Sequence, residues 1–192
     1  MVLDLIPEGS RIVEIGVFEG EFAEVLLKTR PSKLFLIDPW DSVSVSGDAN
    51  GNNVHPADLP QVFEKLKERF REHEAVRLLR GRSPPALAEV GKIGDGFVDA
   101  VYIDGDHSYE GVRRDLLASL RIVRPGGWIM GHDYDMNPEK TSNRYDFGVK
   151  RAVEEVCAAH DLKISALAMD GCISYAIRVP EKPEPLYSGW GC

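Results

Sequence analysis

Three observations predict an α/β fold whose sheet holds five parallel strands and a C-terminal antiparallel hairpin, seven strands in all. Short strand patterns rich in Val, Ile and Leu alternate five times with helical patterns. Such alternation produces a doubly wound parallel sheet with right-handed crossovers. The run 98–103 is rich in Val, Ile and Tyr, as a strand buried on both faces requires. The last two strand patterns are joined through Asp170-Gly171, a pair favoured in tight hairpin turns.

The individual elements follow from local patterns taken along the chain. The first helix shows an apolar face at Phe22, Val25 and Leu26, which is the spacing of an amphipathic helix. The second strand ends before Pro39, because proline cannot donate a ladder hydrogen bond. The turn 125–127 (Pro-Gly-Gly) is expected to separate the fourth helix from the fifth strand. The predicted strands are 11–15, 34–37, 75–79, 98–103, 128–130, 163–168 and 173–179, and the predicted helices are 22–29, 61–73, 86–90, 109–123 and 147–160.

The chain is expected to form one domain over residues 1–180, followed by an irregular tail over 181–192. A length of 192 residues favours a single domain, and a 43% hydrophobic composition suffices for a sizeable core. Two polar segments, 41–60 and 134–146, are candidate substrate or lid loops, since they are too long for ordinary connections. For the first of them, a disordered surface insertion is an equal alternative.

Charge and cysteine content restrict the classes of partner. The chain has 31 acidic and 23 basic residues, a net charge of −8, which repels nucleic acids and anionic membrane surfaces. The N-terminus lacks a basic leader pattern, and no apolar run approaches the length of a membrane span. Cys157, Cys172 and Cys192 lie far apart, which argues against metal binding by thiolates and favours a reducing compartment. The sequence therefore predicts a cytoplasmic protein.

The turn after the first strand carries the strongest ligand signal. It has the pattern E-x-G-x-x-x-G, with Glu14, Gly16 and Gly20, where a dinucleotide-binding turn would have G-x-G-x-x-G. A carboxylate repels a pyrophosphate but attracts an ammonium or sulfonium group, so the turn favours S-adenosylmethionine over a nicotinamide cofactor. Asp38, 18 residues after Gly20, ends the second strand where an acid accepts hydrogen bonds from a ribose diol. Ser83 is placed to contact an adenine edge.

The sequence around the fourth strand resembles a known family. Residues 103–111 read I-D-G-D-H-S-Y-E-G, and with the first turn and residues 124–133 they resemble a class I S-adenosylmethionine-dependent methyltransferase of the small O-methyltransferase-like group, family 24. The resemblance covers about residues 10–180 and implies a Rossmann-like sheet. It also implies a cofactor site in which Glu14, Gly16 and Gly20 hold the methionine part and Asp38 the ribose. The remaining residues implied on the cofactor side are Trp40, Gly81, Arg82, Ser83 and Asp104.

Two catalytic schemes remain open for the ends of the fourth and fifth strands. Related O-methyltransferases bind a divalent metal, Mg²⁺ or Mn²⁺, through positions that correspond here to Asp104, His132 and Asp133. The imidazole departs from that oxygen-rich pattern and puts magnesium in doubt. Without a metal, His107 or His132 would accept the acceptor's proton, with Asp104 and Asp133 in the same catalytic set. Asp106 or Ser108 has the simpler alternative role of capping the helix that follows.

The most specific function that these patterns support is methyl transfer from S-adenosylmethionine to a hydroxyl oxygen of a small molecule, such as a sugar, polyketide or phenol. The alternative is a non-catalytic S-adenosylmethionine-binding module or a partner subunit of a larger assembly. The chain begins almost at its first strand, so a homodimer in which a second subunit completes the site wall is also expected. The two polar loops would select the acceptor.

Overall fold

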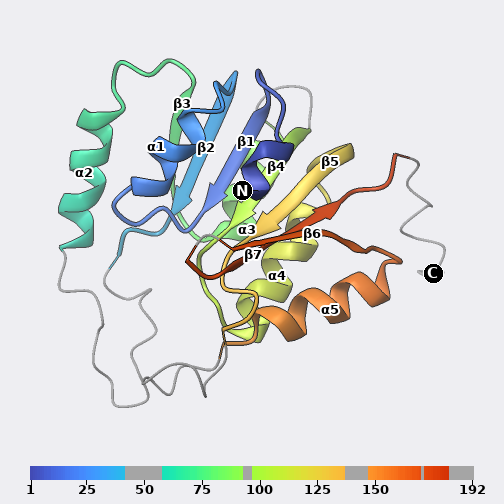
Figure 1. Cartoon of the computed structure of the whole chain (residues 1–192). Coiled ribbons are helices and arrows are strands. Elements are labelled where there is room, and N and C mark those ends of the chain that lie inside the picture. The colour runs from blue at the N-terminus through green and yellow to red at the C-terminus, as the bar shows by residue number, and fades with distance from the viewer. Residues whose placement is uncertain (42–57, 93–96, 137–146, 170, 182–192) are drawn as a thin grey trace, which may run out of the picture.

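A computed structural model describes residues 1–41, 58–92, 97–136, 147–169 and 171–181 of the chain. Its sheet has seven strands in the order β3-β2-β1-β4-β5-β7-β6. The strands from β3 to β5 are parallel, and β7 pairs antiparallel with both β5 and the edge strand β6. Figure 1 shows this arrangement. The predicted α/β sheet with a C-terminal hairpin is confirmed. The strands are β1 (Arg11–Ile15), β2 (Lys33–Asp38), β3 (Val76–Arg80), β4 (Val98–Ile103), β5 (Val123–Gly131), β6 (Ile164–Met169) and β7 (Ile173–Arg178).

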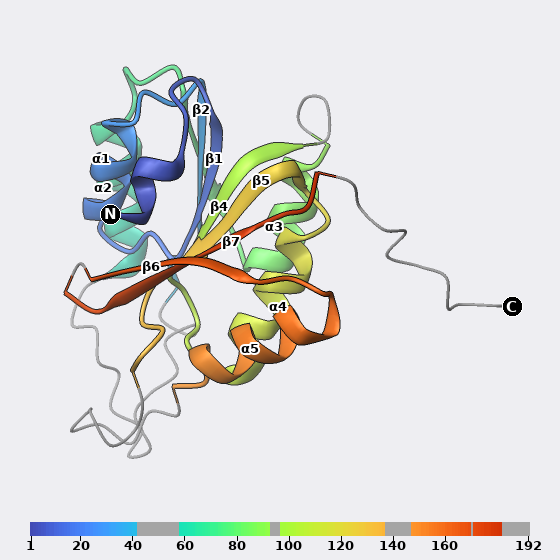
Figure 2. The ribbon, with the colours of Figure 1, turned by 45° about the vertical axis from the view of Figure 1, so that its right-hand side comes forward.

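Helices cover both faces of the sheet, as the doubly wound pattern predicts (Figure 2). Successive side chains along the parallel strands point to opposite faces of the sheet and pack into two separate hydrophobic cores. Val13 and Ile15 belong to one core, and Ile12 belongs to the other. The first core packs under α3 (Ser83–Val90), α4 (Tyr109–Ser119) and α5 (Val149–Ala159). The second packs under α1 (Glu21–Leu27), α2 (Leu59–Arg69) and a short 3₁₀ helix, η1 (Val2–Leu5), which the sequence patterns did not predict.

The beginning of β5 differs from the prediction. The segment 125–127 does not form a turn ahead of the strand, because β5 already begins at Val123 and contains it. The pairing of β5 with β4 shifts register between Val98 and Ala100, and Gly126 adopts a positive φ of 72° in the irregular stretch. Its N–H still donates to the Val179 carbonyl over 2.9 Å, so the sheet continues through the irregularity. Helix α4 ends at Ser119, whereas the predicted helix extended to residue 123. The prediction was too long because a short run of apolar residues fits either the end of a helix or a buried strand.

The parallel strands bring their carboxyl ends to one edge of the sheet. Ile15 pairs with Ile37 on β2 and with Ile103 on β4, which in turn pairs with Gly131 on β5. The arrowheads of β1, β2 and β5 therefore point to the same side of the molecule in Figure 1. Open α/β sheets bind their ligands at this edge. The acidic and imidazole side chains singled out in the sequence lie here.

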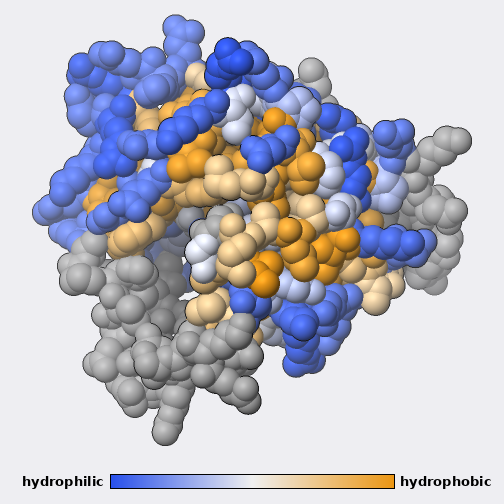
Figure 3. All heavy atoms as spheres, viewed as in Figure 1, coloured by the Kyte–Doolittle hydropathy of each residue, from blue (hydrophilic) through white to orange (hydrophobic). Residues whose placement is uncertain are grey.

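The other surfaces carry fewer indications of function. Figure 3 shows apolar side chains gathered over η1 and the β6–β7 hairpin, where Leu167 and Met169 are exposed. None of the helices in the described ranges is long and apolar enough to cross a membrane. Of the predicted loops and tail, residues 42–57, 137–146 and 182–192 lie outside the described residues, as does Asp170 of the predicted hairpin turn.

Candidate active site

The turn between β1 and α1 is shaped by its glycines. Gly16 has φ +87° and Gly20 has φ +79°, a left-handed region that other residues adopt at a cost. Gly16 also lies so close to β4 that a Cβ there would overlap the backbone carbonyl of Asp104. The β1 turn and the end of β4 thus touch through main chain alone. Only glycine at position 16 permits this approach.

Glu14, on β1 just before this turn, is a buried acid with an oxygen that lacks a partner. Its side chain is 1% exposed, and Oε2 accepts no hydrogen bond from any described residue. Burial raises the pKa of Glu14 well above its usual value, and the nearby carboxylates of Asp104 and Asp38 raise it further. Burying a carboxylate without a partner is unfavourable. The position therefore favours a ligand that brings hydrogen-bond donors and positive charge.

Asp38, at the end of β2, holds the first turn from the neighbouring strand. Its Oδ2 accepts hydrogen bonds from the N–H groups of Val17 and Phe18, each 3.1 Å, and its Oδ1 accepts from the N–H of Trp40 at 2.7 Å. Burial nevertheless raises the pKa of Asp38, because it outweighs the lowering effect of these three bonds. The predicted ribose contact stays a prediction. The anchoring of the turn is a role that the sequence pattern did not reveal.

The loop after β4 brings an imidazole between two carboxylates. Nε2 of His107 lies 3.1 Å from Oδ1 of Asp104 and 3.3 Å from Oδ2 of Asp133. Nδ1 of His132 lies 3.1 Å from Oδ1 of Asp133 and 4.0 Å from Oδ1 of Asp104. All four side chains are partly accessible to solvent. The four residues predicted as a catalytic set thus form one cluster at the ends of β4 and β5.

The backbone around this cluster is fixed by local contacts. Ser108 is the N-cap of α4, and its Oγ accepts from the N–H of Gly111 at 3.1 Å, while Asp106 Oδ1 accepts from the N–H of Ser108 at 3.0 Å. The capping alternative is therefore confirmed for Ser108, whereas Asp106 holds the N–H of the capping residue itself. The carbonyl of His107 accepts from the N–H of Gly148, at the start of α5, over 2.9 Å. The backbone that carries the His107 imidazole is therefore held from the starts of α4 and α5.

Asp133 combines an unusual backbone with a stabilised charge. Its φ is +56°, in the left-handed region that few residues other than glycine adopt, although aspartate does so more often than most, and residues in such conformations cluster at functional sites. Burial disfavours its ionised form. The hydrogen bond from His132 and the proximity of the His107 and His132 imidazoles more than compensate, so the pKa of Asp133 is lowered. Unlike the Oε2 atom of Glu14, this carboxylate already has imidazole partners.

Comparison with known proteins settles the family. A family model described as a methyltransferase domain matches residues 13–134, well over half of the chain, from β1 to just beyond the end of β5. The chain belongs to the class I S-adenosylmethionine-dependent methyltransferases. The matched segment contains Glu14 and Asp38 as well as the cluster of Asp104, His107, His132 and Asp133.

Individual relatives are distant from this methyltransferase. The uncharacterized protein R132 of Acanthamoeba polyphaga mimivirus is 27% identical over 127 residues, 64% of this chain, and the chain spans about half (50%) of that relative's length. The O-methyltransferase TomG of Streptomyces achromogenes, involved in tomaymycin synthesis and solved with S-adenosylmethionine, superposes with a TM-score of 0.65 at 17% identity, over 93% of this chain and 77% of its own. An O-methyltransferase from Bacillus cereus in complex with SAH gives 0.64 at 16% identity, over 93% and 76% of the two chains. At these identities the structures confirm the fold.

Trp40 contributes to the methyltransferase site from inside the core. Its side chain is fully buried, packs on the ring of Phe63 at a centroid distance of 4.9 Å, and donates from Nε1 to the Phe18 carbonyl over 2.9 Å. The Trp40 carbonyl in turn accepts from Arg80 at 3.0 Å. In this structure both faces of the indole are buried, so Trp40 stabilises the first turn through its hydrogen bond to the Phe18 carbonyl.

The adenine-side loop, from Gly81 to Ser83, differs from the expectation in one respect. The N–H of Gly81 donates to the Asp38 carbonyl over 3.0 Å, which places the loop beside the end of β2, and Arg82 is exposed. The hydroxyl of Ser83, expected to meet an adenine edge, is buried and donates to Oδ1 of Asp115 on α4. Burial of Asp115 raises its pKa to about 6, although the bond from Ser83 and the charge of Arg114 oppose the rise.

Asp115 is the residue at this site that sequence reasoning missed. It lies three positions after Val112, on the same buried face of α4, where an apolar side chain would be ordinary. The signal available in the sequence was an acidic residue at a helix position where the periodicity predicts a buried apolar side chain, which indicates a buried polar partner. Its buried partner could not be inferred, because Ser83 is 32 residues away in the chain.

The donor sets for a metal differ from the predicted one. Among the described residues, Asp104, His107 and Asp133 each place a ligand atom within 4.8 Å of the others, and so do His132, Asp133 and Cys172. The predicted set paired Asp104 and Asp133 with His132, whereas the geometry groups these two acids with His107. Two carboxylates and one imidazole fit Mn²⁺ better than Mg²⁺, which prefers an all-oxygen shell. A metal bound there would lower the pKa of a coordinated hydroxyl.

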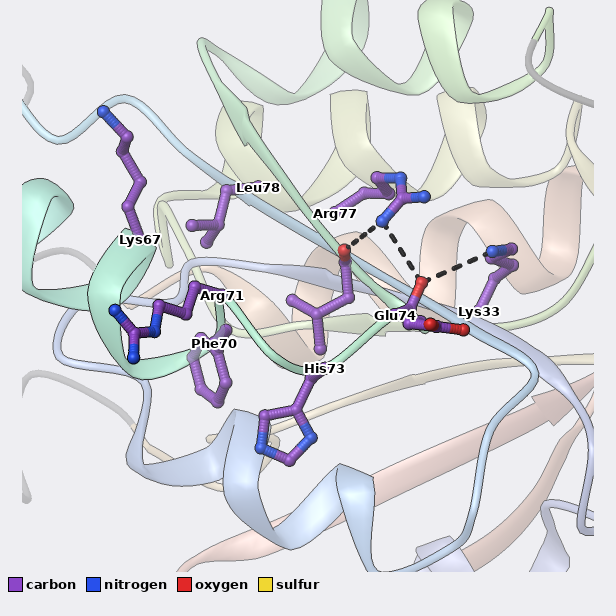
Figure 4. Close-up of a pocket in the computed structure, with 9 residues that line it drawn as sticks. Lys33, Lys67, Phe70, Arg71, His73, Glu74, Arg77 and Leu78 are labelled. Carbon is purple, nitrogen blue, oxygen red and sulfur yellow. Dashed lines mark hydrogen bonds between the residues drawn. The ribbon is translucent and has the colours of Figure 1, made fainter.

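A separate hollow of the methyltransferase domain lies away from these residues. It is lined by basic side chains at the amino end of the sheet and the end of α2. Figure 4 shows that two of them turn toward backbone carbonyls. Lys33 donates to the Glu74 carbonyl at 3.5 Å, and Arg77 to the carbonyls of Glu74 and Val76 at 3.2 and 2.9 Å. These bonds cap the backbone before β3, at the edge opposite to the active site.

Proposed function

We propose that this methyltransferase moves the methyl group of S-adenosylmethionine to a hydroxyl oxygen of a small-molecule acceptor. The observation that carries the proposal is the arrangement at one sheet edge. Glu14, a buried acid whose Oε2 has no hydrogen-bond partner among the described residues, lies near the end of β1, and His107 lies between Asp104 and Asp133 at the ends of β4 and β5. The first side suits a cationic cofactor and the second suits removal of a proton.

The cofactor side is acidic, and its most deeply placed acid, Glu14, is sheltered from water. Glu14, Asp38 and Asp104 are close enough that the charges of the last two raise the pKa of the first. S-adenosylmethionine supplies an ammonium group, a sulfonium centre and the electrophilic methyl group. Its positive charge would relieve the repulsion among the three carboxylates, and its ammonium would give Glu14 Oε2 the donor that it lacks.

The acceptor side can take up the proton that a hydroxyl releases. The acceptor's hydroxyl oxygen attacks the methyl carbon on the side opposite to the departing sulfur, and the hydroxyl loses its proton during the attack. A base must therefore lie beside the hydroxyl. His107 suits this role, because the hydrogen bond between its Nε2 and Asp104 favours the tautomer whose lone pair is on Nδ1. The two neighbouring carboxylates would stabilise the imidazolium that forms, as the aspartate does in a Ser-His-Asp triad.

A small acceptor fits the charge of the molecule. A net charge of −8 disfavours nucleic acid as the substrate, because phosphate backbones would be repelled. Sugars, polyketides and phenols carry hydroxyl groups without a fixed negative charge and remain the proposed acceptor classes. The segments expected to select among them fall mostly outside the described residues.

The proposal is tested in two steps that separate binding from turnover. Calorimetric titration with S-adenosylmethionine and its demethylated product should show binding by the wild type, and weaker binding by Glu14→Gln. Release of S-adenosylhomocysteine is then measured over a panel of hydroxylated acceptors, with and without Mn²⁺. Binding without turnover on any acceptor would favour the non-catalytic module, and absence of binding would overturn the proposal altogether.

A further inference from the structure

The tip of the β6–β7 hairpin brings a thiol to the end of β5. Cys172 precedes β7, about 40 positions after His132 and Asp133 in the sequence. Its sulfur, a ring nitrogen of His132 and a carboxylate oxygen of Asp133 lie within 4.8 Å of one another. We propose that these three side chains bind a borderline-soft divalent cation of the Zn²⁺ class. The widely spaced cysteines argued against a thiolate ligand, and the fold reverses that argument for Cys172.

The donor atoms determine which ion fits. Imidazole nitrogen, thiolate sulfur and carboxylate oxygen are all ligands of Zn²⁺, which takes a tetrahedral shell. Three protein ligands leave the fourth position to water or to a substrate oxygen, as in catalytic zinc sites. Mg²⁺ is excluded on the same grounds, because it demands oxygen ligands in octahedral geometry.

The main chain already holds the two segments together. The N–H of Tyr134 donates to the Ile173 carbonyl over 2.9 Å, and the N–H of Ile173 donates to Oδ1 of Asp135 over 3.1 Å. These bonds connect the residues that immediately follow Asp133 to those that immediately follow Cys172. The left-handed backbone of Asp133 fits the same tight junction. The ligands are therefore brought together by the fold, which lowers the cost of ordering them around an ion.

The proposed ion would be distinct from one held by Asp104 and His107. Asp133 faces His132 with Oδ1, at 3.1 Å, and His107 with Oδ2, at 3.3 Å. An ion on the His132 and Cys172 side leaves Oδ2 available to His107. The carboxylate would then bind the ion through one oxygen and accept a hydrogen bond from the His107 imidazole through the other, and carboxylates that bind metals are generally hydrogen-bonded in this way. The proposal itself does not depend on methyl transfer.

Cobalt substitution tests the site without any activity assay. Chelator-treated, reduced protein is titrated with Co²⁺, and a thiolate-to-cobalt charge-transfer band in the near ultraviolet is expected to saturate at one equivalent. Zn²⁺ should displace Co²⁺ and remove the band, whereas Mg²⁺ should not. Cys172→Ser should lack the band and lose at least about tenfold in Zn²⁺ affinity, the loss typical even of altering an outer partner of a metal ligand.

Matched variants make the result decisive. Cys157→Ser, on the buried face of α5, and Cys192→Ser should keep the band. Circular dichroism confirms that each variant is folded, and His132→Gln provides a second ligand deletion that should weaken Co²⁺ binding and shift the spectrum. A wild type without the band at a large excess of Co²⁺, or a band that survives in Cys172→Ser, would overturn the proposal and show a hydrogen-bonded cluster without an ion.

Discussion

The two sides of the active-site edge treat their carboxylates in opposite ways. At the ends of β1 and β2, Glu14 is buried and Asp38 is partly buried, neither forms an ion pair with another described residue, and the pKa values of both are raised. At the end of β5, Asp133 is also partly buried, but two imidazoles lie beside it and its pKa is lowered. The difference shows which charge each side lacks. The first side suits a ligand that brings positive charge, and the second already has imidazole partners beside its carboxylate.

Under the proposed function, this contrast places cofactor binding and proton removal at the ends of different strands. A site that stores unpaired negative charge is less stable when empty than when filled, which favours ligand binding over stability of the empty protein. A site whose carboxylates are already paired can hold an imidazole in a defined orientation in the absence of ligand. Substitutions on the two sides should therefore change different measurable quantities.

The largest expected effect is on turnover, from His107→Ala. Loss of a general base typically costs 10²- to 10⁴-fold, so kcat should fall by about that factor while the Kd for S-adenosylmethionine changes less than about threefold. Steady-state kinetics with calorimetry checks both values. Phe147→Leu, which removes the ring stacked beside His107 at 5.6 Å but retains the imidazole, is the matched control. An equal loss of kcat and cofactor affinity in His107→Ala would contradict the assignment of cofactor binding to one side of the edge and proton removal to the other.

The next effect concerns stability and extends the comparison to Asp115, whose buried partner Ser83 is neutral. The pKa of Asp115 rises to about 6 in the folded protein, from an ordinary 3.8, so the folded state binds the proton more tightly. This group therefore reduces the free energy of unfolding as pH rises from about 4 to about 6, by about 3 kcal/mol, and the loss stays constant above that window.

Asp115→Asn should remove this contribution. The variant keeps an oxygen that can accept from Ser83, so its stability relative to wild type should increase by about 3 kcal/mol between pH 4 and pH 6. Urea denaturation at a series of pH values measures the difference. A parallel pH dependence in the two proteins would show that Asp115 is ionised without penalty in the folded state.

Glu14→Gln sharpens the comparison because it should change two quantities in opposite directions. Loss of a hydrogen bond to a charged group costs about 1.5–3 kcal/mol, so the affinity for S-adenosylmethionine should fall by about 10- to 100-fold. The empty protein should become more stable at pH 8, because a buried carboxylate is replaced by a neutral amide. Thermal melts without and with the cofactor measure both effects. A variant less stable than wild type when empty would contradict the view that Glu14 lacks a partner.

The smallest effect is expected from Ser108→Ala, at the start of α4. Removal of an N-cap hydroxyl typically costs about 1 kcal/mol, which should lower the melting temperature modestly. Because Ser108 is adjacent to His107, turnover at a permissive temperature reports whether the cap also orients the imidazole. Ser108→Asp should restore stability, and failure to do so would show that the hydroxyl has a role other than capping.

Local patterns in the sequence were sufficient for much of the fold and the site. Alternating apolar periods predict the β/α order, and an acid at a strand end predicts a side chain at the ligand-binding edge. Asp38 and Asp104 were found in this way, Glu14 was found from the E-x-G-x-x-x-G pattern of the first turn, and the cap at Ser108 followed from residue type and position. These features depend on residues that are near one another in the chain, so short-range periodicity and residue type carry the information.

Features that depend on distant segments were decided only by the tertiary structure. The partners Ser83 and Asp115 are 32 positions apart, and Cys172 lies about 40 positions from His132. The start of β5 at Val123 was missed because an apolar run has no period that separates the end of a helix from a buried strand. The sequence by itself determined which chemical groups reach the sheet edge. Packing of the helices and the final hairpin decided which of those groups touch, because contacts between distant segments depend on the three-dimensional register of the whole sheet.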